Sequence, residues 1–296
     1  MSGPVGTVAA GGSVVAPGRV AVVTGAASGI GLALAARFAA EGMRLVMADI
    51  EEPALRKAAA GLAGGGAEVL PVPTDVSSLA QVENLRAEAV RAFGSVQVLC
   101  NNAGVGGPHD PIWLISPGDW DWVLRVNLGA VIHGIRTFVP LLLEQDAAHI
   151  VNRSSVFGAF AGALGPYGIS KHAITALSET LYFQLREHGA RIGVSVLCPG
   201  AVRTRFGSSA RNRPAWAGTP TGSGAAERAS EERFEQLQAR SGADPAQVAS
   251  LVVEGIRCGR FYIRCPVSGC RVTTGCNGPS AVSYSETAGS GGEVCS

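Results

Sequence analysis

The chain has 296 residues, a formal net charge of +1 and a sequence pI near 7.6. That length suits one large α/β domain or two smaller domains. Hydrophobic residues make up 47% and charged residues 16% of the sequence, against a charged share of roughly 25% in ordinary globular proteins. This composition excludes bulk disorder. Lys and Arg form no long run, so a nucleic-acid partner is not expected.

Residues 1–18 contain Gly and Pro but no Lys or Arg. They lack the positive start of a secretory signal, so we expect a flexible leader and a cytoplasmic protein. The longest uncharged apolar stretch lies between Arg19 and Arg37, but it contains Thr24, Ser28 and several glycines. A membrane-spanning helix would disfavour those residues, so we expect no membrane association.

Three segments repeat one pattern, in which a helical apolar stripe is followed by Gly and then by a short apolar strand. The helices are expected at 33–41, 82–93 and 177–188, and the strands at 45–48, 96–99 and 192–197. A Gly ends each helix, and strands that alternate with helices pair in parallel through right-handed crossovers. The pattern predicts a single doubly wound parallel α/β sheet with helices on both faces.

The remaining elements fit between these segments. Further strands are expected at 20–23, 69–72, 149–152 and 261–263, which makes about seven in all. A long helix should begin at Ser116, whose side chain caps it, and run to about Glu144. Residues 205–221 are irregular and precede a polar helix near 225–239, and a final helix begins near Asp244. Because residues 205–240 follow the carboxyl end of a strand, they are a candidate substrate lid.

The first strand runs directly into a glycine-rich turn and a helix. Glycines such as Gly25 and Gly31 let the backbone approach a pyrophosphate, while the helix N-terminus supplies N–H groups. A glycine-rich turn alone would be a weak signal. Here Asp49 ends the second strand, where a carboxylate can bind ribose hydroxyls, and this context indicates dinucleotide binding.

Asp49 also bears on which dinucleotide binds. A 2′-phosphate would meet its carboxylate, and Glu51 and Glu52 would add repulsion. Arg44 lies roughly 16 Å away along the strand, at about 3.3 Å per residue, and is too far to compensate. NAD is therefore favoured over NADP. The alternative is that Asp49 is a solvated acid at a strand end.

Tyr167 and Lys171 are one helical turn apart and share a face. An unperturbed Tyr has a pKa near 10, but a neighbouring ammonium and a cationic nicotinamide favour the phenolate and lower that pKa. Such pairs arise often by chance. This one follows the fifth strand, whose end carries Ser154 and Ser155 at the mouth of the same sheet.

With these motifs the sequence resembles the short-chain dehydrogenase/reductase family. The resemblance extends from about Arg19 to Arg264 and implies a single Rossmann-type domain, a homotetramer or homodimer, and hydride transfer between a nicotinamide cofactor and an alcohol or ketone. The matching segments are Thr24-Gly25 with Gly29-Ile30-Gly31, Asp75-Val76, Asn101-Asn102-Ala103-Gly104, Asn127, Ser155-Val156-Phe157-Gly158, Tyr167 with Lys171, and Pro199-Gly200 with Thr204.

The resemblance also implies roles for individual residues. Tyr167 would be the general acid/base, Ser155 would hydrogen-bond the reacting oxygen, and Lys171 would hold the nicotinamide ribose. Asn127 would position a water that links Lys171 to solvent, unless it is merely a helix residue satisfied by the backbone. Asp75 and Val76 would contact adenine. The cofactor positions implied are Gly25, Ser28, Gly29, Ile30, Gly31, Asp49, Asp75, Val76, Asn102, Ala103, Gly104, Tyr167, Lys171, Pro199, Gly200, Val202 and Thr204, the last two at the carboxamide.

The spacing between the serine and Tyr167 departs from the family pattern. Ser154 has the usual separation from Tyr167, whereas Ser155 is one residue closer but matches the local Ser-x-x-Gly pattern. We favour Ser155. Adjacent residues at a strand end point to opposite faces, so the two serines cannot both serve the substrate.

Three functions remain open. The leading one is an NAD-dependent dehydrogenase for a secondary alcohol, with an apolar substrate suggested by Phe157, Phe160, Leu164 and the nearby tryptophans. An NADPH-dependent carbonyl reductase would use the same residues, and a non-catalytic dinucleotide-binding protein is a further alternative. The scattered histidines predict no metal site.

Apolar periodicity stops after Arg264. Residues 265–296 are rich in Gly, Ser, Thr and Cys, so we expect a poorly ordered tail after a catalytic domain of residues 19–264. Its four cysteines include no CxxC pair, which argues against zinc. A reading-frame change that replaced the original ending is one hypothesis, and a genuine flexible extension is another.

Overall fold

The structure is a computed structural model that describes residues 13–158, 164–222, 236 and 238–265. Its centre is one 7-stranded sheet in the order β3-β2-β1-β4-β5-β6-β7, and every neighbouring pair is parallel. The expected doubly wound parallel sheet is therefore confirmed. The strands are β1 Val20–Thr24, β2 Arg44–Asp49, β3 Val69–Pro73, β4 Val98–Asn101, β5 Ala148–Arg153, β6 Ile192–Cys198 and β7 Tyr262–Arg264.

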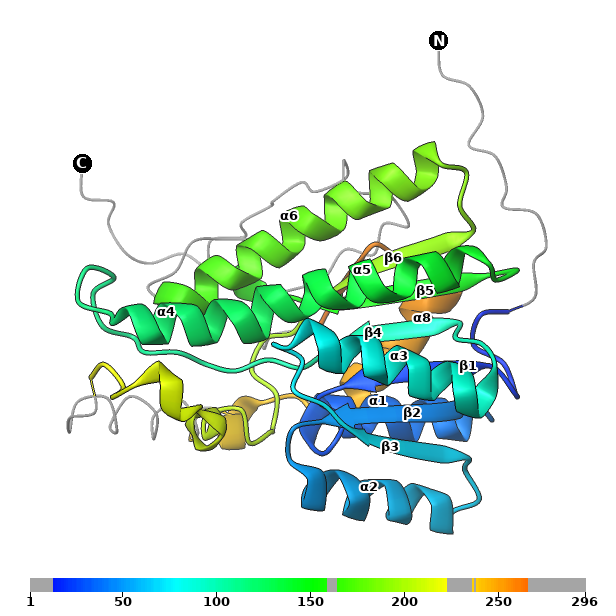
Figure 1. Cartoon of the computed structure of the whole chain (residues 1–296), viewed down its shortest axis with the longest axis horizontal. Coiled ribbons are helices and arrows are strands. Elements are labelled where there is room, and N and C mark those ends of the chain that lie inside the picture. The colour runs from blue at the N-terminus through cyan, green and yellow to red at the C-terminus, as the bar shows by residue number, and fades with distance from the viewer. Residues whose placement is uncertain (1–12, 159–163, 223–235, 237, 266–296) are drawn as a thin grey trace, which may run out of the picture.

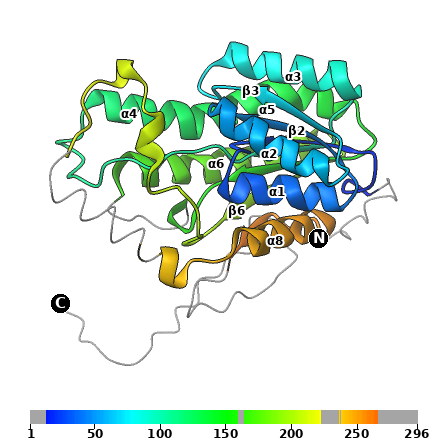
Figure 2. The same ribbon diagram turned by 90° about the horizontal axis from the view of Figure 1, so that it is seen from below.

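Helices cover both faces of the sheet (Figures 1 and 2). One layer contains α1 Gly29–Ala40, α2 Glu52–Gly64 and α8 Pro245–Arg257. The other contains α3 Leu79–Phe93, α4 Pro117–Leu124, α5 Ala130–Leu143 and α6 Gly165–Glu187. Each connection returns the chain to the start of the next parallel strand, so all strand carboxyl ends meet at one edge of the sheet.

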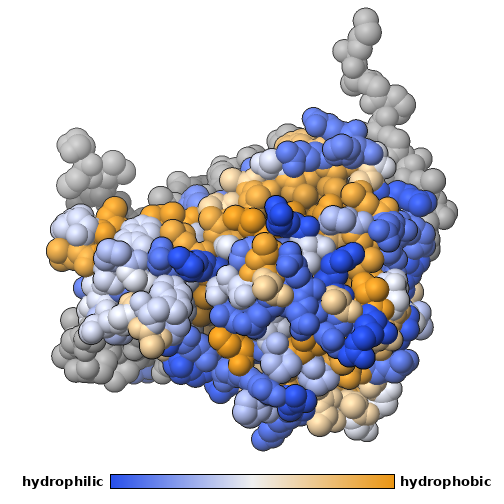
Figure 3. Space-filling view, in the orientation of Figure 1, coloured by the Kyte–Doolittle hydropathy of each residue, from blue (hydrophilic) through white to orange (hydrophobic). Residues whose placement is uncertain are grey.

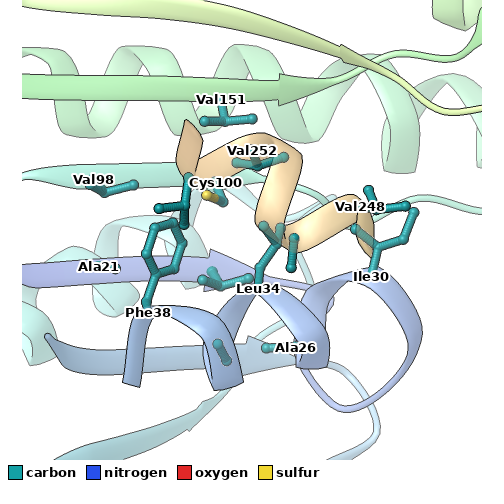
Figure 4. Packing of buried hydrophobic residues seen from close by; sticks show 14 of the residues in the cluster. Ala21, Ala26, Ile30, Leu34, Phe38, Val98, Cys100, Val151, Val248 and Val252 are labelled. Carbon is teal, nitrogen blue, oxygen red and sulfur yellow. The ribbon is translucent and has the colours of Figure 1, made fainter. Parts of the chain in front are cut away.

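Side chains on each strand alternate between two hydrophobic cores, as the period of two requires. Ala21 and Val23 of β1 face α1 and α8, where Leu34 and Phe38 pack against Val252 (Figure 4). On the opposite face, side chains of β1, β2 and β4 pack against α3, α5 and α6. This core includes Val20, Val22, Val46 and Leu99 from the strands and Phe138 and Leu181 from the helices. Burial on both faces explains why the strands are nearly continuous apolar runs.

The long helix expected from Ser116 is present, but it contains a π-helical turn at Arg125–Gly129 between α4 and α5. Ser116 caps it by accepting a hydrogen bond from the Asp119 N–H at 3.2 Å. Within the described part of the chain, Pro117–Leu143 is the one helical segment long and apolar enough to cross a membrane by length and composition. In the fold, its side chains Phe138, Leu141 and Leu142 pack on the sheet.

Two expected boundaries are corrected by the structure. Val15 is 3% exposed and packs in the core beside α1, so the leader expected at 1–18 includes residues that belong to the domain. Cys265, expected to begin the tail, is also buried, and its N–H donates to the Cys198 carbonyl at 3.5 Å. Val15 and Cys265 are both buried by residues that are distant in sequence. Residues 1–12 and 266–296, and most of the helix expected at 225–239, lie outside the described residues.

Candidate active site

A cleft with about 1020 Å³ of open space lies at the carboxyl ends of the strands. Its walls come from the β1–α1 loop, the ends of β2 to β5 and the segment after β6. In open parallel sheets, ligands bind at this edge. Twelve of the predicted cofactor residues line the cleft: Gly25, Ser28, Gly29, Ile30, Gly31, Asp49, Asp75, Val76, Asn102, Ala103, Gly104 and Thr204.

The glycine-rich turn is held by close backbone packing. A Cβ on Gly31 would lie 2.0 Å from the Gly25 carbonyl oxygen and 2.6 Å from Asn102 Nδ2. Gly25 and Gly29 have φ values of +65° and +55°, which favour glycine. Ser28 caps α1 without a side-chain hydrogen bond. The first N–H groups of α1 thus lie beside the cleft, where they suit a pyrophosphate.

Asp49 stands at the end of β2 beside this turn. Its carboxylate accepts hydrogen bonds from the backbone N–H groups of Ala27 at 2.9 Å and Glu51 at 3.0 Å. These two bonds fix the side chain next to the cleft. Because carboxylate oxygens can accept further bonds, the carboxylate can also bind ribose hydroxyls.

The segment after β6, where a lid is expected, brings cations to the same end of the cleft. Arg211 Nε donates to Glu51 Oε1 at 2.9 Å, Asn212 Nδ2 donates to the same oxygen at 2.9 Å, and Arg205 lies 3.8 Å from Glu51 Oε2. Sequence analysis had considered only cations close in sequence to Asp49. Arg205 and Arg211 therefore offset the negative charge of Glu51, which reduces the repulsion expected between Glu51 and a 2′-phosphate.

The loops after β3 and β4 border the middle of the cleft. Asp75 accepts hydrogen bonds from the Ser77 N–H at 2.9 Å and the Ser77 hydroxyl at 2.7 Å. Asn102 Nδ2 donates to the Thr24 carbonyl at 2.8 Å, whereas its Oδ1 is buried without a partner among the described residues. That unpartnered acceptor, the α1 N-terminus and Asp49 together fit a dinucleotide with its phosphates and ribose hydroxyls.

Ser155 and Tyr167 meet at the sheet edge. Ser155 follows β5 and is 4% exposed, and its hydroxyl interacts with Tyr167, whose pKa is raised by burial and only partly lowered by Arg153 and this hydroxyl. Lys171 comes from the next turn of α6 and is fully buried. Its Nζ lies 5.5 Å from the centre of the Tyr167 ring and donates to the Arg153 carbonyl at 3.0 Å.

Burial has the largest effect on the ionisation of this group. It raises the pKa of Tyr167, against the opposing influence of the Arg153 guanidinium and Ser155. Burial, followed by repulsion from Arg153, lowers the pKa of Lys171 well below its ordinary value. The expected lowering of the Tyr167 pKa by Lys171 is therefore not seen in the protein alone, because desolvation disfavours both charges.

Ser154 points to the other side of the strand end. Its hydroxyl donates to the Lys171 carbonyl at 2.8 Å and lies 2.9 Å from Thr175 Oγ1, inside the contact with α6. The structure thus brings Ser155 to Tyr167 and buries Ser154 behind it. This arrangement favours Ser155 as the serine that contacts substrate.

Asn127 lies in the π-helical turn and is fully buried. Its Oδ1 accepts from the Val105 N–H at 2.8 Å, and its Nδ2 donates to the Val105 carbonyl at 3.0 Å and to Ser170 Oγ at 3.1 Å. The backbone of the β4–α4 loop therefore satisfies it, as in the alternative weighed from sequence. Asn127 Oδ1 and Lys171 Nζ lie 3.1 and 3.5 Å from the position of a Cβ on Gly104, so both groups adjoin one point of the cleft.

The segment after β6 covers the glycine turn. The Pro199 carbonyl accepts from the Val156 N–H at 3.1 Å, and Gly200 follows it. Val202 pairs with Ala243 and is 3% exposed. Thr204 places its methyl group 2.9 Å from where a Cβ on Gly29 would stand. Pro199, Gly200 and Val202 support the cleft from behind, and Thr204 lines it.

Arg153 and Phe206 are among the cleft residues that sequence analysis did not single out. The Phe206 ring lies 5.4 Å from the Tyr167 ring and 5.7 Å from the Arg153 guanidinium carbon. Arg153 had a detectable signal, because it places a charge at the end of a buried strand and shares the side of Ser155 by strand alternation. Phe206 had none, since it lies in an irregular segment.

These features define a dinucleotide-binding oxidoreductase of the doubly wound class. A family model described as short chain dehydrogenase matches residues 19–215. The chain belongs to the short-chain dehydrogenase/reductase family, whose members transfer hydride between nicotinamide cofactors and alcohol or ketone substrates. The expected family and enzyme class are confirmed.

Similar proteins include enzymes and a solved complex. The chain is 46% identical to 1-deoxy-11-beta-hydroxypentalenate dehydrogenase of Streptomyces exfoliatus over 189 residues, which is 63% of this chain and 68% of that protein. It is 32% identical to the CLA biosynthesis dehydrogenase/reductase of Lactiplantibacillus plantarum, over 83% and 87% of the two chains. A Burkholderia phymatum short-chain dehydrogenase/reductase, crystallised with NAD, is 43% identical with a TM-score of 0.81, over 84% and 89% of the chains.

Proposed function

We propose that this protein is an NAD-dependent dehydrogenase that interconverts a secondary alcohol with an apolar body and its ketone. The observation that carries the proposal is the juxtaposition of Ser155 and Tyr167 beside buried Lys171, at the same sheet edge as a cleft that suits a dinucleotide. Apolar side chains on the substrate side of the cleft support an apolar body; they are Val105, Trp122, Val126, Phe206 and Trp216.

In this reaction the bound NAD supplies the acceptor for the hydride that leaves the carbinol carbon. The positive charges of bound NAD and Arg153 would favour the Tyr167 phenolate, which can then take the proton of the substrate hydroxyl, and Ser155 donates a hydrogen bond to the same oxygen. Lys171 holds the cofactor ribose beside Tyr167. Asn127 keeps the β4–α4 loop and α6 in register, and its position beside Gly104 suits a water that relays protons from Lys171.

The experiment that tests this function follows NADH absorbance with a panel of steroid, terpenoid and aliphatic secondary alcohols. Turnover of at least one alcohol is expected. Tyr167→Phe removes the oxygen that transfers the proton and should lower the rate about 10² to 10⁴-fold, with NADH binding nearly unchanged. Binding of NADH without oxidation of any alcohol, or reduction of any ketone, would favour the non-catalytic alternative.

NAD is the proposed cofactor because Asp49 faces the position of the ribose hydroxyls. A carboxylate accepts hydrogen bonds from a 2′-hydroxyl and repels a 2′-phosphate. We expect a higher kcat/KM with NAD than with NADP, and Asp49→Ala should narrow the ratio at least tenfold. Asp146→Ala is the matched control, because Asp146 lies just before β5, away from the cleft, where it is 51% exposed and pairs with Arg19.

One observation favours the NADPH-dependent reductase as a second candidate. Arg205 and Arg211 reach the same end of the cleft from the lid, and both line it. If Glu51 releases them, they can contact a 2′-phosphate. A wild-type preference for NADP would establish this candidate and exclude the role proposed for Asp49.

We also propose that the protein is a cytoplasmic homodimer or homotetramer. The outer surfaces of α5 and α6 expose large apolar side chains (Figure 3), which single soluble chains rarely leave uncovered as a continuous patch. Light scattering measures the oligomeric state of the purified protein directly. The exposed residues are Ile132, Leu143, Ile169 and Phe183, at 44%, 52%, 47% and 50%.

A further inference from the structure

Arg153 places a guanidinium at the reacting end of the cleft. It is the last residue of β5, and strand alternation puts its side chain on the side of Ser155. Its Nη2 lies 2.9 Å from the position of a Cβ on Gly104, and its Cζ lies 5.7 Å from the centre of the Phe206 ring. The side chain therefore lies over Gly104 and lines the cleft.

No carboxylate of the described residues pairs with this guanidinium, which lies against the Phe206 ring and interacts electrostatically with Tyr167. The acids that line the cleft have other partners at the cofactor end. The Asp49 carboxylate accepts hydrogen bonds from the backbone N–H groups of Ala27 and Glu51, and the Asp75 carboxylate accepts one from the Ser77 N–H. A guanidinium in a cleft usually meets a carboxylate or phosphate, so a guanidinium that lacks both among the described residues points to a ligand.

A second cation lies beside it. Lys171 Nζ is 3.5 Å from the same Cβ position on Gly104 that Arg153 Nη2 approaches to 2.9 Å. Positive charges on Arg153 and Lys171 would repel each other strongly because both groups are removed from water. An oxidised nicotinamide would bring a further positive charge. The pKa of Lys171 is lowered mainly by burial and further by repulsion from Arg153. A bound anion would offset this excess of positive charge.

Two anions could in principle meet Arg153, namely the cofactor pyrophosphate and a group on the substrate. The glycine turn and the N-terminus of α1 already provide a pyrophosphate site with backbone N–H groups. Arg153 instead adjoins Ser155, Tyr167 and Lys171, where the substrate oxygen reacts. The position therefore favours the substrate.

Building on the dehydrogenase function proposed above, we propose that Arg153 binds a carboxylate of the substrate, so that the enzyme acts on secondary hydroxy acids and the matching oxo acids. The planar guanidinium can hold both carboxylate oxygens, which fixes orientation as well as position. The apolar walls at Trp122, Val126 and Phe206 would receive the rest of the molecule. The substrate would thus combine an apolar body with one anionic group.

The first experiment measures binding without turnover. Isothermal titration adds 3-hydroxycyclohexanecarboxylate, 4-hydroxycyclohexanecarboxylate or 9-hydroxydecanoate to the wild-type enzyme saturated with NADH, which cannot oxidise them, and then adds the methyl ester of each. At least one acid should bind about tenfold or more tightly than its ester. Arg153→Met keeps the length and apolar stem but removes the charge, and should weaken the acid about 10- to 100-fold while leaving the ester within threefold.

Steady-state oxidation of the same hydroxy acids and esters is the second arm. Arg153→Met should lower kcat/KM for the acid by the same factor, and Arg153→Lys should restore part of it as a point charge. Arg125→Met is the matched control, because Arg125 also stacks on an aromatic ring, Trp216 at 5.2 Å, but is exposed. Melting temperature and NADH affinity are recorded for every variant.

The outcomes separate this proposal from the dehydrogenase function. If Arg153→Met lowered kcat/KM equally for the acid and the ester, Arg153 would be assigned to the chemistry. If it weakened NADH binding, Arg153 would be assigned to the cofactor. Either result overturns the proposal. Failure of the wild-type NADH complex to favour any acid over its ester also overturns it, even if neutral alcohols are oxidised. Absence of all turnover with tight acid binding would instead refute the dehydrogenase function alone.

Discussion

Adjacent serines at the end of β5 have different surroundings because strand side chains alternate. Ser155 shares a hydrogen bond with Tyr167, whereas Ser154 donates to the Lys171 carbonyl and is 1% exposed. The spacing to Tyr167 that favours Ser154 in sequence is therefore outweighed by the direction of the side chain. A loop can absorb one missing residue, but a strand cannot turn a side chain to its other face.

We expect Ser155→Ala to lower kcat/KM about 10²-fold or more, because it removes a donor to the oxygen that becomes charged during hydride transfer. Ser154→Ala serves as the matched control and should keep kcat/KM within about threefold. It should instead lower the free energy of unfolding by about 1 kcal/mol, since it deletes a buried hydrogen bond. Steady-state kinetics and urea unfolding separate the two effects. The opposite ranking of activities would transfer the substrate contact to Ser154.

At the scale of elements, the segment after β6 is tied to α4 by one buried acid. Asp119 is 1% exposed and forms an ion pair with Arg213. Its Oδ2 accepts from the Thr221 N–H at 2.9 Å, the Thr221 hydroxyl at 2.6 Å and the Ser116 hydroxyl at 2.7 Å. The same segment places Phe206 and Trp216 along the cleft.

Asp119→Asn should loosen this lid without unfolding the domain, because it removes the charge that pairs with Arg213, whose side chain is 9% exposed. Breaking a buried pair costs about 3 to 5 kcal/mol. Hydrogen exchange in residues 205–222 should therefore accelerate at least tenfold, and KM for substrate should rise. Asp121→Asn is the control, since Asp121 is exposed and its pair with Arg125 contributes little. Unchanged exchange in Asp119→Asn would show that other contacts hold the lid.

Elements with strong periodicity were predictable, and irregular ones were not. All seven strands lie within two residues of their expected positions, because each is an apolar run bounded by Gly or polar residues. Helix α2 was not predicted, since only Leu55 and Ala59 are buried along it and Gly61 interrupts its pattern. The π-helical turn around Asn127 has no sequence signal either. It depends on hydrogen bonds to Val105 from another loop.

At the scale of the whole molecule, distant contacts limit what the sequence predicts about the site. The glycine turn, Asp49, Tyr167 and Lys171 were recognisable because their spacing or strand context is local. The ion pair between Glu51 and Arg211 joins residues 160 positions apart, and the contact of Phe206 with Tyr167 likewise depends on how the lid folds back. Such pairs follow from tertiary packing rather than from local periodicity. The electrostatics at both ends of the cleft therefore required the structure.

The stability of the whole domain should depend on one histidine in the sheet. His149 of β5 is 3% exposed, and its Nε2 lies 2.7 Å from Ser195 Oγ, whose hydroxyl donates to the Arg260 carbonyl at 2.6 Å. Ser195 therefore accepts a hydrogen bond from the neutral ring. Burial lowers the pKa of His149 to about 4, below an ordinary value near 6.5. The unfolded chain thus binds the proton more readily than the folded protein does.

Because the folded-state pKa is the lower one, the stabilising contribution of neutral His149 is complete above pH 6.5 and is lost as pH falls towards 4. Between pH 7 and 5, the free energy of unfolding should fall by up to about 2 kcal/mol from this group. Urea titrations at several pH values measure that slope. His149→Gln should flatten it, whereas His188→Gln, at an exposed position after α6, should retain it. An equal slope in wild type and His149→Gln would mean that other groups set the acid sensitivity of the fold.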